Sequence, residues 1–241
     1  MSLAWQTGTV VAAHAETGSA RSLDIEVPGW TGNLAGQHLD LRLSAPDGYT
    51  ATRSYSIASA GPGKRIQLAV DRLPDGEVSP YLVDEVAVGD PLEIRGPLGG
   101  WFVWHPEDAG PVQLIAGGSG IVPLMSMIRA HNTAGSSARF RLLYSVRSPA
   151  DVFFSAELDD LAENDAALEV DRVYTRETPA GWPTAPGRVS RSILEASTIE
   201  ATEEPTVFVC GPTGFVEAVA DILVALGHPA DRVKTERFGG T

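Results

Sequence analysis

The sequence is nearly free of cysteine: its 241 residues contain one, Cys210. A single thiol cannot form a disulfide within the chain. An all-cysteine metal site or iron–sulfur cluster needs several thiolates, so this sequence cannot build one by itself.

Long apolar segments are missing as well. No apolar run approaches the roughly 20 residues that span a bilayer. Residues 1–10 lack the basic region and apolar block that together mark a signal peptide. These two absences predict a cytoplasmic protein.

Positive charge is scarce. The 18 Lys and Arg residues are outnumbered by 31 Asp and Glu residues, which gives a net charge of −13. A charge of this sign repels nucleic acid and anionic membrane surfaces. Apolar residues at 43% and charged residues at 20% are typical of a globular protein.

The first part of the chain, residues 1–106, has the pattern of an all-β domain. Leu39 and Leu41 alternate with Asp40 and Arg42, the period of a half-buried strand. Strands are predicted at residues 9–13, 22–27, 38–43, 51–58, 66–70 and 91–95, separated by turns such as residues 46–48. This spacing predicts a closed antiparallel barrel. One helix is expected at residues 79–86, with Ser79 as its N-cap.

Residues 110–241 have a different pattern, in which apolar strands alternate with amphipathic helices. Strands are predicted at residues 112–116, 139–146, 168–174, 207–210 and 232–236, and helices at 121–130, 151–161, 190–196 and 215–226. Strict alternation predicts a parallel sheet covered by helices. The polar segment 105–110 separates this α/β domain from the barrel.

A tetrad on one predicted strand, Arg53-Ser54-Tyr55-Ser56, suggests a large anionic ligand. Arg53 and Tyr55 project to the same face of the strand. The guanidinium fork suits a pyrophosphate, and the ring suits stacking on a flat heterocycle. The turn Gly76-Glu77-Val78-Ser79 follows and leads into a helix start that favours a phosphate. By itself, however, such a tetrad is usually surface alternation.

The order of these motifs, followed by Gly96-Pro97-Leu98-Gly99-Gly100, resembles the ferredoxin–NADP reductase superfamily over nearly the whole chain. The resemblance implies that FAD is bound by the barrel. It implies that Arg53 and the turn bind the FAD phosphates, that Tyr55 lies beside the flavin ring, and that Ser56 contacts flavin N5. The remaining cofactor-binding residues that it implies are Ser54, Val70 through its backbone, Gly76, Val78 and Ser79.

A glycine loop follows the first strand of the second domain and contains Gly118, Ser119, Gly120 and Pro123. Glycines let a backbone approach a pyrophosphate, and the next helix start supplies N–H donors. The spacing departs from the standard dinucleotide fingerprint, but G-G-x-G-x-x-P is similar to the superfamily's own version. Such a loop can also simply connect a strand to a helix.

Arg147 and Arg176 follow two predicted strand ends, and Arg188 lies in the segment that opens the next predicted helix. An acidic residue at the end of the second strand would instead bind a ribose 2′-OH. A cluster of arginines there suits the 2′-phosphate of NADPH. The sequence therefore favours NADPH, with NADH possible because relatives that use NADH keep the first arginine.

The last motifs are Cys210-Gly211-Pro212, after a buried strand, and the C-terminal residues 236–241. Ligands bind at the carboxyl ends of such strands. The resemblance places Cys210, Gly211 and Pro212 beside the nicotinamide, with Phe238 over the flavin and Glu236 balancing charge or protons near N5. The alternative for Cys210 is a small buried filler.

The resemblance thus implies an FAD-dependent NAD(P)H oxidoreductase of the ferredoxin reductase type, in which Ser56, Cys210 and Glu236 serve the hydride step. Because the four cysteines of a fused ferredoxin domain are missing, we expect a stand-alone monomer that passes single electrons to a separate iron–sulfur or oxygenase protein. The alternatives are a reductase of small acceptors, such as free flavin, quinone or ferric chelates, and a noncatalytic flavin-binding subunit.

Overall fold

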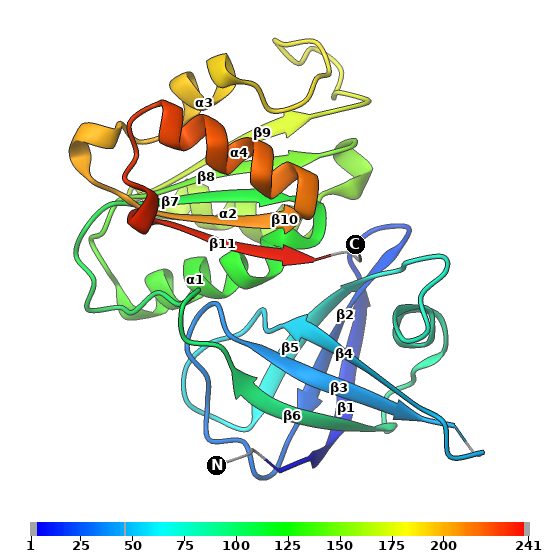
Figure 1. Cartoon of the computed structure of the whole chain (residues 1–241). Helices are drawn as coiled ribbons and strands as arrows, with labels where there is room; N and C mark the ends of the chain where they lie inside the picture. The colour runs from blue at the N-terminus through cyan, green and yellow to red at the C-terminus, as the bar shows by residue number, and fades with distance from the viewer. Residues whose placement is uncertain (1–3, 46, 239–241) are drawn as a thin grey trace. The chain divides into compact units, whose positions relative to one another are not determined.

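A computed structural model describes residues 4–45 and 47–238, which divide into two compact units (Figure 1). The first unit contains residues up to 105 together with residues 125–130, and the second contains residues 106–124 and those from 131 onward. The domain limits 1–106 and 110–241 stay predictions. Pro46 of the predicted turn and the C-terminal residues 239–241 lie outside the described residues.

The first unit is built on a six-stranded antiparallel sheet (Figure 1). Its strands are β1 (Gln6–Ala15), β2 (Ala20–Glu26), β3 (His38–Ser44), β4 (Thr50–Ser56), β5 (Arg65–Asp71) and β6 (Pro91–Leu98). The order is β4-β3-β6-β1-β2-β5, and the edge strands meet where Ile57 bridges Leu68. The predicted antiparallel barrel is confirmed.

The core of the barrel follows from the alternation in the strands. Leu39 and Leu41 of β3 are fully buried, whereas Asp40 and Arg42 lie on the other face. Asp40 accepts hydrogen bonds there from Arg95 at 2.6 Å and from Ser54 at 2.7 Å. A partly solvated polar face on one side and a packed apolar face on the other are what an antiparallel sheet requires.

The predicted helix at residues 79–86 is corrected by the structure. Its regular part is a π-helix, η1 (Tyr81–Glu85), preceded by Pro80 as N-cap residue. Ser79 does not cap it, because the Ser79 hydroxyl accepts a hydrogen bond from the N–H of Leu73 at 3.0 Å. This bond closes the turn before the helix, so Ser79 shapes the turn rather than the helix end.

The second unit is a five-stranded parallel sheet with helices between its strands (Figure 1). The strands are β7 (Val112–Gly117), β8 (Phe140–Val146), β9 (Leu168–Tyr174), β10 (Thr206–Pro212) and β11 (Val233–Phe238), in the order β11-β10-β7-β8-β9. The helices are α1 (Ile121–Ala134), α2 (Ser155–Asn164), α3 (Arg191–Ser197) and α4 (Thr213–Ala225). Short 3-10 turns lie at η2 (Gly118–Gly120), η3 (Pro149–Asp151), η4 (Ala201–Glu203) and η5 (Ala230–Arg232). The predicted α/β fold is confirmed.

Two helix starts show how local chemistry sets the boundaries. Ser190, the first residue of the predicted helix 190–196, is instead the N-cap of α3 and accepts a hydrogen bond from the N–H of Ile193 at 3.4 Å. Helix α2 begins later than the predicted residue 151, because Phe154 adopts a left-handed conformation with φ of 54°. Such a residue cannot belong to a right-handed helix.

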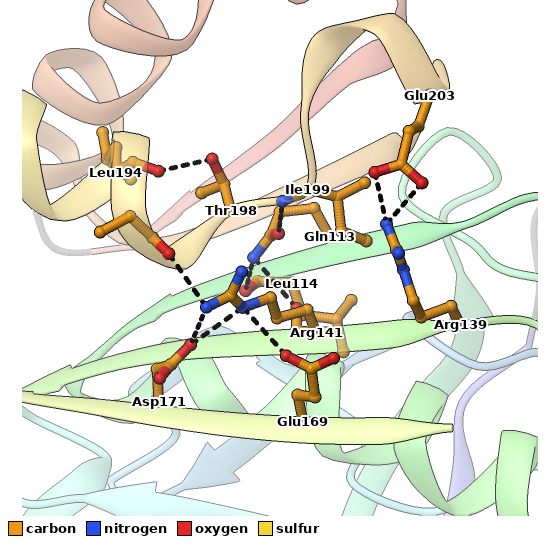
Figure 2. Close-up of polar contacts among 11 residues, drawn as sticks. Gln113, Leu114, Arg139, Arg141, Glu169, Asp171, Leu194, Thr198, Ile199 and Glu203 are labelled. Carbon is orange, nitrogen blue, oxygen red and sulfur yellow. Dashed lines mark hydrogen bonds and ion pairs between the residues drawn. The ribbon is translucent and has the colours of Figure 1, made fainter. Parts of the chain in front are cut away.

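A polar network ties the amino ends of the parallel strands to the segment after α3 (Figure 2). The Gln113 side chain is fully buried; it donates to the carbonyl of Arg141 at 3.0 Å and accepts from the N–H of Ile199 at 2.8 Å. Arg141 also contacts Asp171 at 2.9 Å. The network therefore stabilises the amino ends of the strands. In such sheets, ligands bind at the opposite, carboxyl ends of the strands.

No helix within residues 4–45 and 47–238 is long and apolar enough to cross a membrane.

The buried amide of Gln113 should contribute strongly to stability. Replacement by Leu leaves the Ile199 N–H and the Arg141 carbonyl without their partner, at about 1–3 kcal/mol for each group. We expect Gln113→Leu to lower the free energy of unfolding by about 2–4 kcal/mol in urea denaturation. The control is Arg139→Gln, which breaks an exposed pair with Glu203 and should cost less than about 1 kcal/mol. Equal losses in the two variants would contradict this account.

Candidate functional site

Two residues expected to bind the flavin, Arg53 and Tyr55, lie on the face of β4 that pairs with the core residues Leu41 and Leu39 of β3. Arg53 is about half exposed, with 51% of its side chain accessible. Tyr55 is partly buried and packs against the barrel core. Burial raises the pKa of Tyr55 to about 12, and the nearby Arg53 charge opposes this only in part. At neutral pH the strand therefore presents a cation and an uncharged aromatic ring on one face.

Arg53 has two partners in this structure. One nitrogen donates to the carbonyl of Thr52 at 2.8 Å, and another forms an ion pair with Glu77. The other carboxylate oxygen of Glu77 accepts from the hydroxyl of Tyr49 at 2.7 Å. Arg53 of the tetrad and Glu77 of the turn at residues 76–79 are 24 residues apart in the sequence. Contact between their side chains joins the two segments.

The turn at residues 76–79 leaves little room for a side chain at Gly76. A Cβ atom on Gly76 would lie 2.8 Å from the Ser79 hydroxyl oxygen and 3.1 Å from the Leu73 carbonyl oxygen. The N–H of Gly76 donates to that same carbonyl at 2.9 Å, and Val78 is buried. The turn is tight and anchored at both ends, a form of backbone that a phosphate can approach closely.

The structure also places the other residues of the first unit that were predicted to bind the flavin. Ser54 donates its hydroxyl to Asp40, on the face opposite Arg53 and Tyr55. Val70 packs its side chain into the barrel core, and its register partner in β2 is Arg21. Ser56 ends β4 and is partly buried. Their roles toward a flavin stay predictions.

A hollow of about 480 Å³ adjoins the pair of Arg53 and Glu77. It is lined by Arg42, Leu43, Ser44, Ala45, Tyr49, Ala51, Glu77, Tyr81, Pro91 and Glu93. The volume falls in the range of small-molecule sites. Because Glu77 and Tyr49 belong to both features, a ligand on Arg53 has space beside it.

In the second unit, the glycine loop and the C-G-P segment meet at the carboxyl ends of β7 and β10. A Cβ on Gly120 would lie 2.1 Å from the carbonyl oxygen of Cys210, and one on Gly117 would lie 2.7 Å from the Phe215 ring. Gly118 has φ of +55°, which favours glycine. The structure thus brings these predicted segments together and leads from the loop directly into α1, with Ser119 in the loop and Pro123 buried in the first turn of the helix.

Cys210 lies between two neighbouring strands, with Ala116 as its register partner in β7 and Glu236 in β11. Burial, followed by the nearby Glu236 charge, raises the pKa of the Cys210 thiol well above its usual value. Burial also raises the pKa of Glu236 to about 7. Cys210 is therefore a neutral thiol, unsuited to nucleophilic attack. Glu236 is a carboxyl group that titrates near neutrality.

The end of β11 runs beside the C-G-P segment. Phe238 is the register partner of Pro212, and Arg237 that of Gly211. Phe238 is exposed, with 36% of its surface accessible. An exposed aromatic ring thus ends the strand next to the predicted nicotinamide-binding segment.

The three predicted arginines lie on adjacent segments. The N–H groups of Arg176 and Glu177 both donate to the carbonyl of Arg147, at 2.9 and 3.1 Å. Arg188 follows Gly187, whose N–H donates to the carbonyl of Tyr174 at 3.0 Å. All three side chains are exposed. They surround the carboxyl ends of β8 and β9 and are available to an anionic group.

The side chains and backbone of both units fit the predicted cofactors. An exposed guanidinium and an aromatic ring on one face of a strand, beside a tight glycine turn, suit a flavin pyrophosphate. A glycine loop that leads into α1, with the C-G-P segment packed against it, suits a second dinucleotide.

Comparison with known proteins agrees with this geometry. Residues 9–103 match the Oxidoreductase FAD-binding domain family, and residues 114–221 match the Oxidoreductase NAD-binding domain family. Ferredoxin–NADP reductase B of Sorangium cellulosum is 33% identical over 210 residues, which cover 85% of this chain and 84% of that protein. The chain belongs to the ferredoxin–NADP reductase superfamily.

Two further proteins are similar to this chain over most of its length. The glycine betaine monooxygenase reductase subunit of Chromohalobacter salexigens is 32% identical, over 86% of this chain and 56% of that protein. The FAD/NAD-binding domain of nitric oxide dioxygenase from Vibrio cholerae O1 biovar El Tor superposes with a TM-score of 0.85, at 25% identity, over 98% and 99% of the two chains. The chain spans about half the length of several curated relatives that it matches.

Two residues of the first unit were not assigned any role from sequence: Glu77 and Tyr49. Glu77 lies inside the G-x-x-S turn at a position that the motif leaves unspecified. Its opposite charge to Arg53 was the available signal, but pairing across 24 residues requires the fold.

The contact between Gly120 and Cys210 should tolerate no side chain. Gly120→Ala places a methyl group against backbone that cannot move aside, and we expect a loss of about 1–3 kcal/mol in the free energy of unfolding. Gly214→Ala is the matched control, because nothing lies within 4 Å of its Cβ in α4. That variant should keep or slightly raise stability. Similar losses in both variants would rule out the close contact.

The raised pKa of Glu236 should make stability depend on pH. In the unfolded chain its pKa is about 4.3, so the folded protein binds the proton more tightly and loses stability as pH rises from about 4 toward 7. Glu236→Gln removes this loss. The difference in unfolding free energy between variant and wild type should therefore grow over that interval and stay constant above it. A difference that is independent of pH would show that Glu236 ionises normally.

Proposed function

We propose that this protein is an FAD-dependent NAD(P)H oxidoreductase of the ferredoxin reductase type. One observation carries the proposal. An exposed guanidinium and a partly buried, uncharged tyrosine share one face of β4, in a chain whose two halves match FAD-binding and NAD-binding domain families. When bound, FAD accepts a hydride from the nicotinamide and releases its electrons one at a time.

In this proposal the first unit binds and orients the flavin. Arg53 binds the pyrophosphate through charge-assisted hydrogen bonds. The turn at Gly76, Val78 and Ser79 offers backbone to a phosphate. Tyr55 flanks the flavin ring, and Ser56, at the end of β4, is the candidate for contact with N5.

The second unit binds the nicotinamide dinucleotide at the carboxyl ends of β7 and β10. Gly118, Ser119 and Gly120 receive the pyrophosphate, with the start of α1 supplying donors. Cys210, Gly211 and Pro212 bind beside the nicotinamide. The neutral thiol adds no charge next to that ring, and Glu236 is able to take or give a proton near pH 7.

NADPH is the preferred donor in this proposal. Arg147, Arg176 and Arg188 are exposed on adjoining segments, and among the described residues their side chains have no carboxylate partner. By contrast, the side chains of Arg139, Arg141 and Arg172 in the same unit are ion-paired. Guanidinium groups that lack a carboxylate partner at the carboxyl ends of β8 and β9 favour the binding of a 2′-phosphate.

The proposed electron acceptor is a separate protein. The relative from Chromohalobacter salexigens is the reductase subunit of a monooxygenase, and this chain has too few cysteines for its own iron–sulfur cluster. A ferredoxin or an oxygenase component is therefore the partner that we propose. A monomeric state and a cytoplasmic location stay predictions from the sequence.

The proposal is tested by adding FAD to the purified chain and following flavin absorbance under NADPH or NADH without oxygen. We expect stoichiometric FAD uptake and bleaching by the nicotinamide. Reduction of ferricyanide, free flavin and a candidate ferredoxin is then compared. Bleaching with transfer only to free flavin or ferricyanide would favour a small-acceptor reductase, and FAD uptake without bleaching would favour a noncatalytic subunit. Failure to bind FAD would overturn the proposal.

The preference for NADPH depends on the arginines. Arg176→Glu places a negative charge at the expected 2′-phosphate position, so the KM for NADPH should rise at least about tenfold while that for NADH changes little. Arg191→Glu, on α3 and paired with Glu195, is the control for an arginine outside this cluster. Equal effects of Arg176→Glu on both nucleotides would remove the 2′-phosphate role.

A further inference from the structure

The ion pair between Arg53 and Glu77 involves the guanidinium to which the proposed function assigns the FAD pyrophosphate. Glu77 uses one carboxylate oxygen for Arg53 and the other for the Tyr49 hydroxyl, at 2.7 Å. Within residues 4–45 and 47–238, the other partner of the Arg53 guanidinium is the backbone carbonyl of Thr52. The charge on Arg53 is thus already paired with an anion from the same chain.

The carboxylate of Glu77 is ionised at neutral pH. The hydrogen bond from Tyr49, and then those from Arg53, lower the pKa of Glu77. The same contact raises the pKa of Tyr49, so the phenol stays protonated and continues to donate. Because all three groups are exposed, the pair is held by direct bonds rather than by burial.

A pyrophosphate on Arg53 would compete with this carboxylate. Both anions cannot take the same guanidinium nitrogens, so Glu77 must leave before the phosphate binds there. Glu77 also lies within the turn that borders the expected phosphate position, so its charge would repel the ligand even after it moves. About half of the Glu77 side chain is exposed, which gives it solvent to move into.

We propose that Glu77 sets the affinity for FAD as an internal competitor for Arg53. The inference rests on the proposed function, because it assumes that Arg53 binds the pyrophosphate. It assigns Glu77 a role specific to phosphate: the carboxylate weakens binding of flavins that carry a pyrophosphate and leaves binding of riboflavin unaffected. The protein then holds FAD in an exchangeable state.

Glu77→Gln tests this inference, because it keeps the shape of the side chain and removes the charge. The full chain is freed of flavin, and FAD and riboflavin are titrated by the change in flavin fluorescence. We expect the Kd for FAD to fall roughly fivefold, as removal of an exposed charge pair and of one repulsion allows. The Kd for riboflavin should not change. The gain for FAD should shrink at high salt, because exposed charges are screened.

Glu203→Gln is the matched control. It removes one carboxylate of an exposed pair with Arg139 in the other unit, where the two side chains are 46% and 45% exposed, against 47% and 51% for Glu77 and Arg53. The net charge changes by the same amount in both variants, so an unchanged Kd for FAD in Glu203→Gln shows that the effect is local.

The outcomes separate the inference from the proposed function. Equal or weaker FAD binding by Glu77→Gln, with normal binding by wild type, overturns the inference and leaves the function intact. A gain of the same size for riboflavin also overturns it, because the effect would not involve phosphate. If neither wild type nor any variant binds FAD, the proposed function itself fails.

Discussion

The proposed flavin site depends on one exposed guanidinium, that of Arg53 in β4. Strand alternation places it on the same face as Tyr55, and pairing of β4 with β3 fixes that face against the barrel. The turn that begins at Gly76 lies close enough for Glu77 to reach it. Charge, aromatic ring and glycine turn therefore belong to one surface, and the fold of the barrel positions all three.

The second unit applies a different constraint, which is close backbone contact. Gly120 approaches Cys210 so closely that no side chain fits, and Gly117 and Gly211 both pack against Phe215. These contacts join the ends of β7 and β10, where ligands of parallel sheets bind. The polar network around Gln113 fixes the opposite ends of the strands (Figure 2). Buried hydrogen bonds thus stabilise the amino ends of the strands, and the carboxyl ends are left for ligand binding.

Both fold classes were predictable from sequence, because the spacing of apolar residues differs between the two domains. Apolar and polar residues alternate singly in residues 38–43, whereas apolar strands alternate with amphipathic helices after residue 111. Local boundaries were less predictable. The start of α2 depends on the left-handed conformation of Phe154, and the hydroxyl of Ser79 bonds to Leu73 instead of a helix end. Neither choice has a signal in the sequence, since both are decided by the surrounding turn.

The candidate site shows the same division. Sequence motifs identified Arg53, the glycine loops and Cys210, because each motif lies within one short strand or loop. The role of Glu77 required knowledge of which segments meet, and the raised pKa of Glu236 to about 7 required knowledge of its burial. Pairing across the chain and desolvation are properties of the folded protein, so sequence patterns alone do not contain them.

The most direct test of the central claim is a titration of FAD and riboflavin against the flavin-free chain and its Arg53→Gln variant. If Arg53 binds the pyrophosphate, the variant should bind FAD about 10- to 100-fold more weakly, the value of a charge-assisted hydrogen bond, and riboflavin as well as wild type does. Unchanged affinity for FAD, or an equal loss for both flavins, would contradict the account.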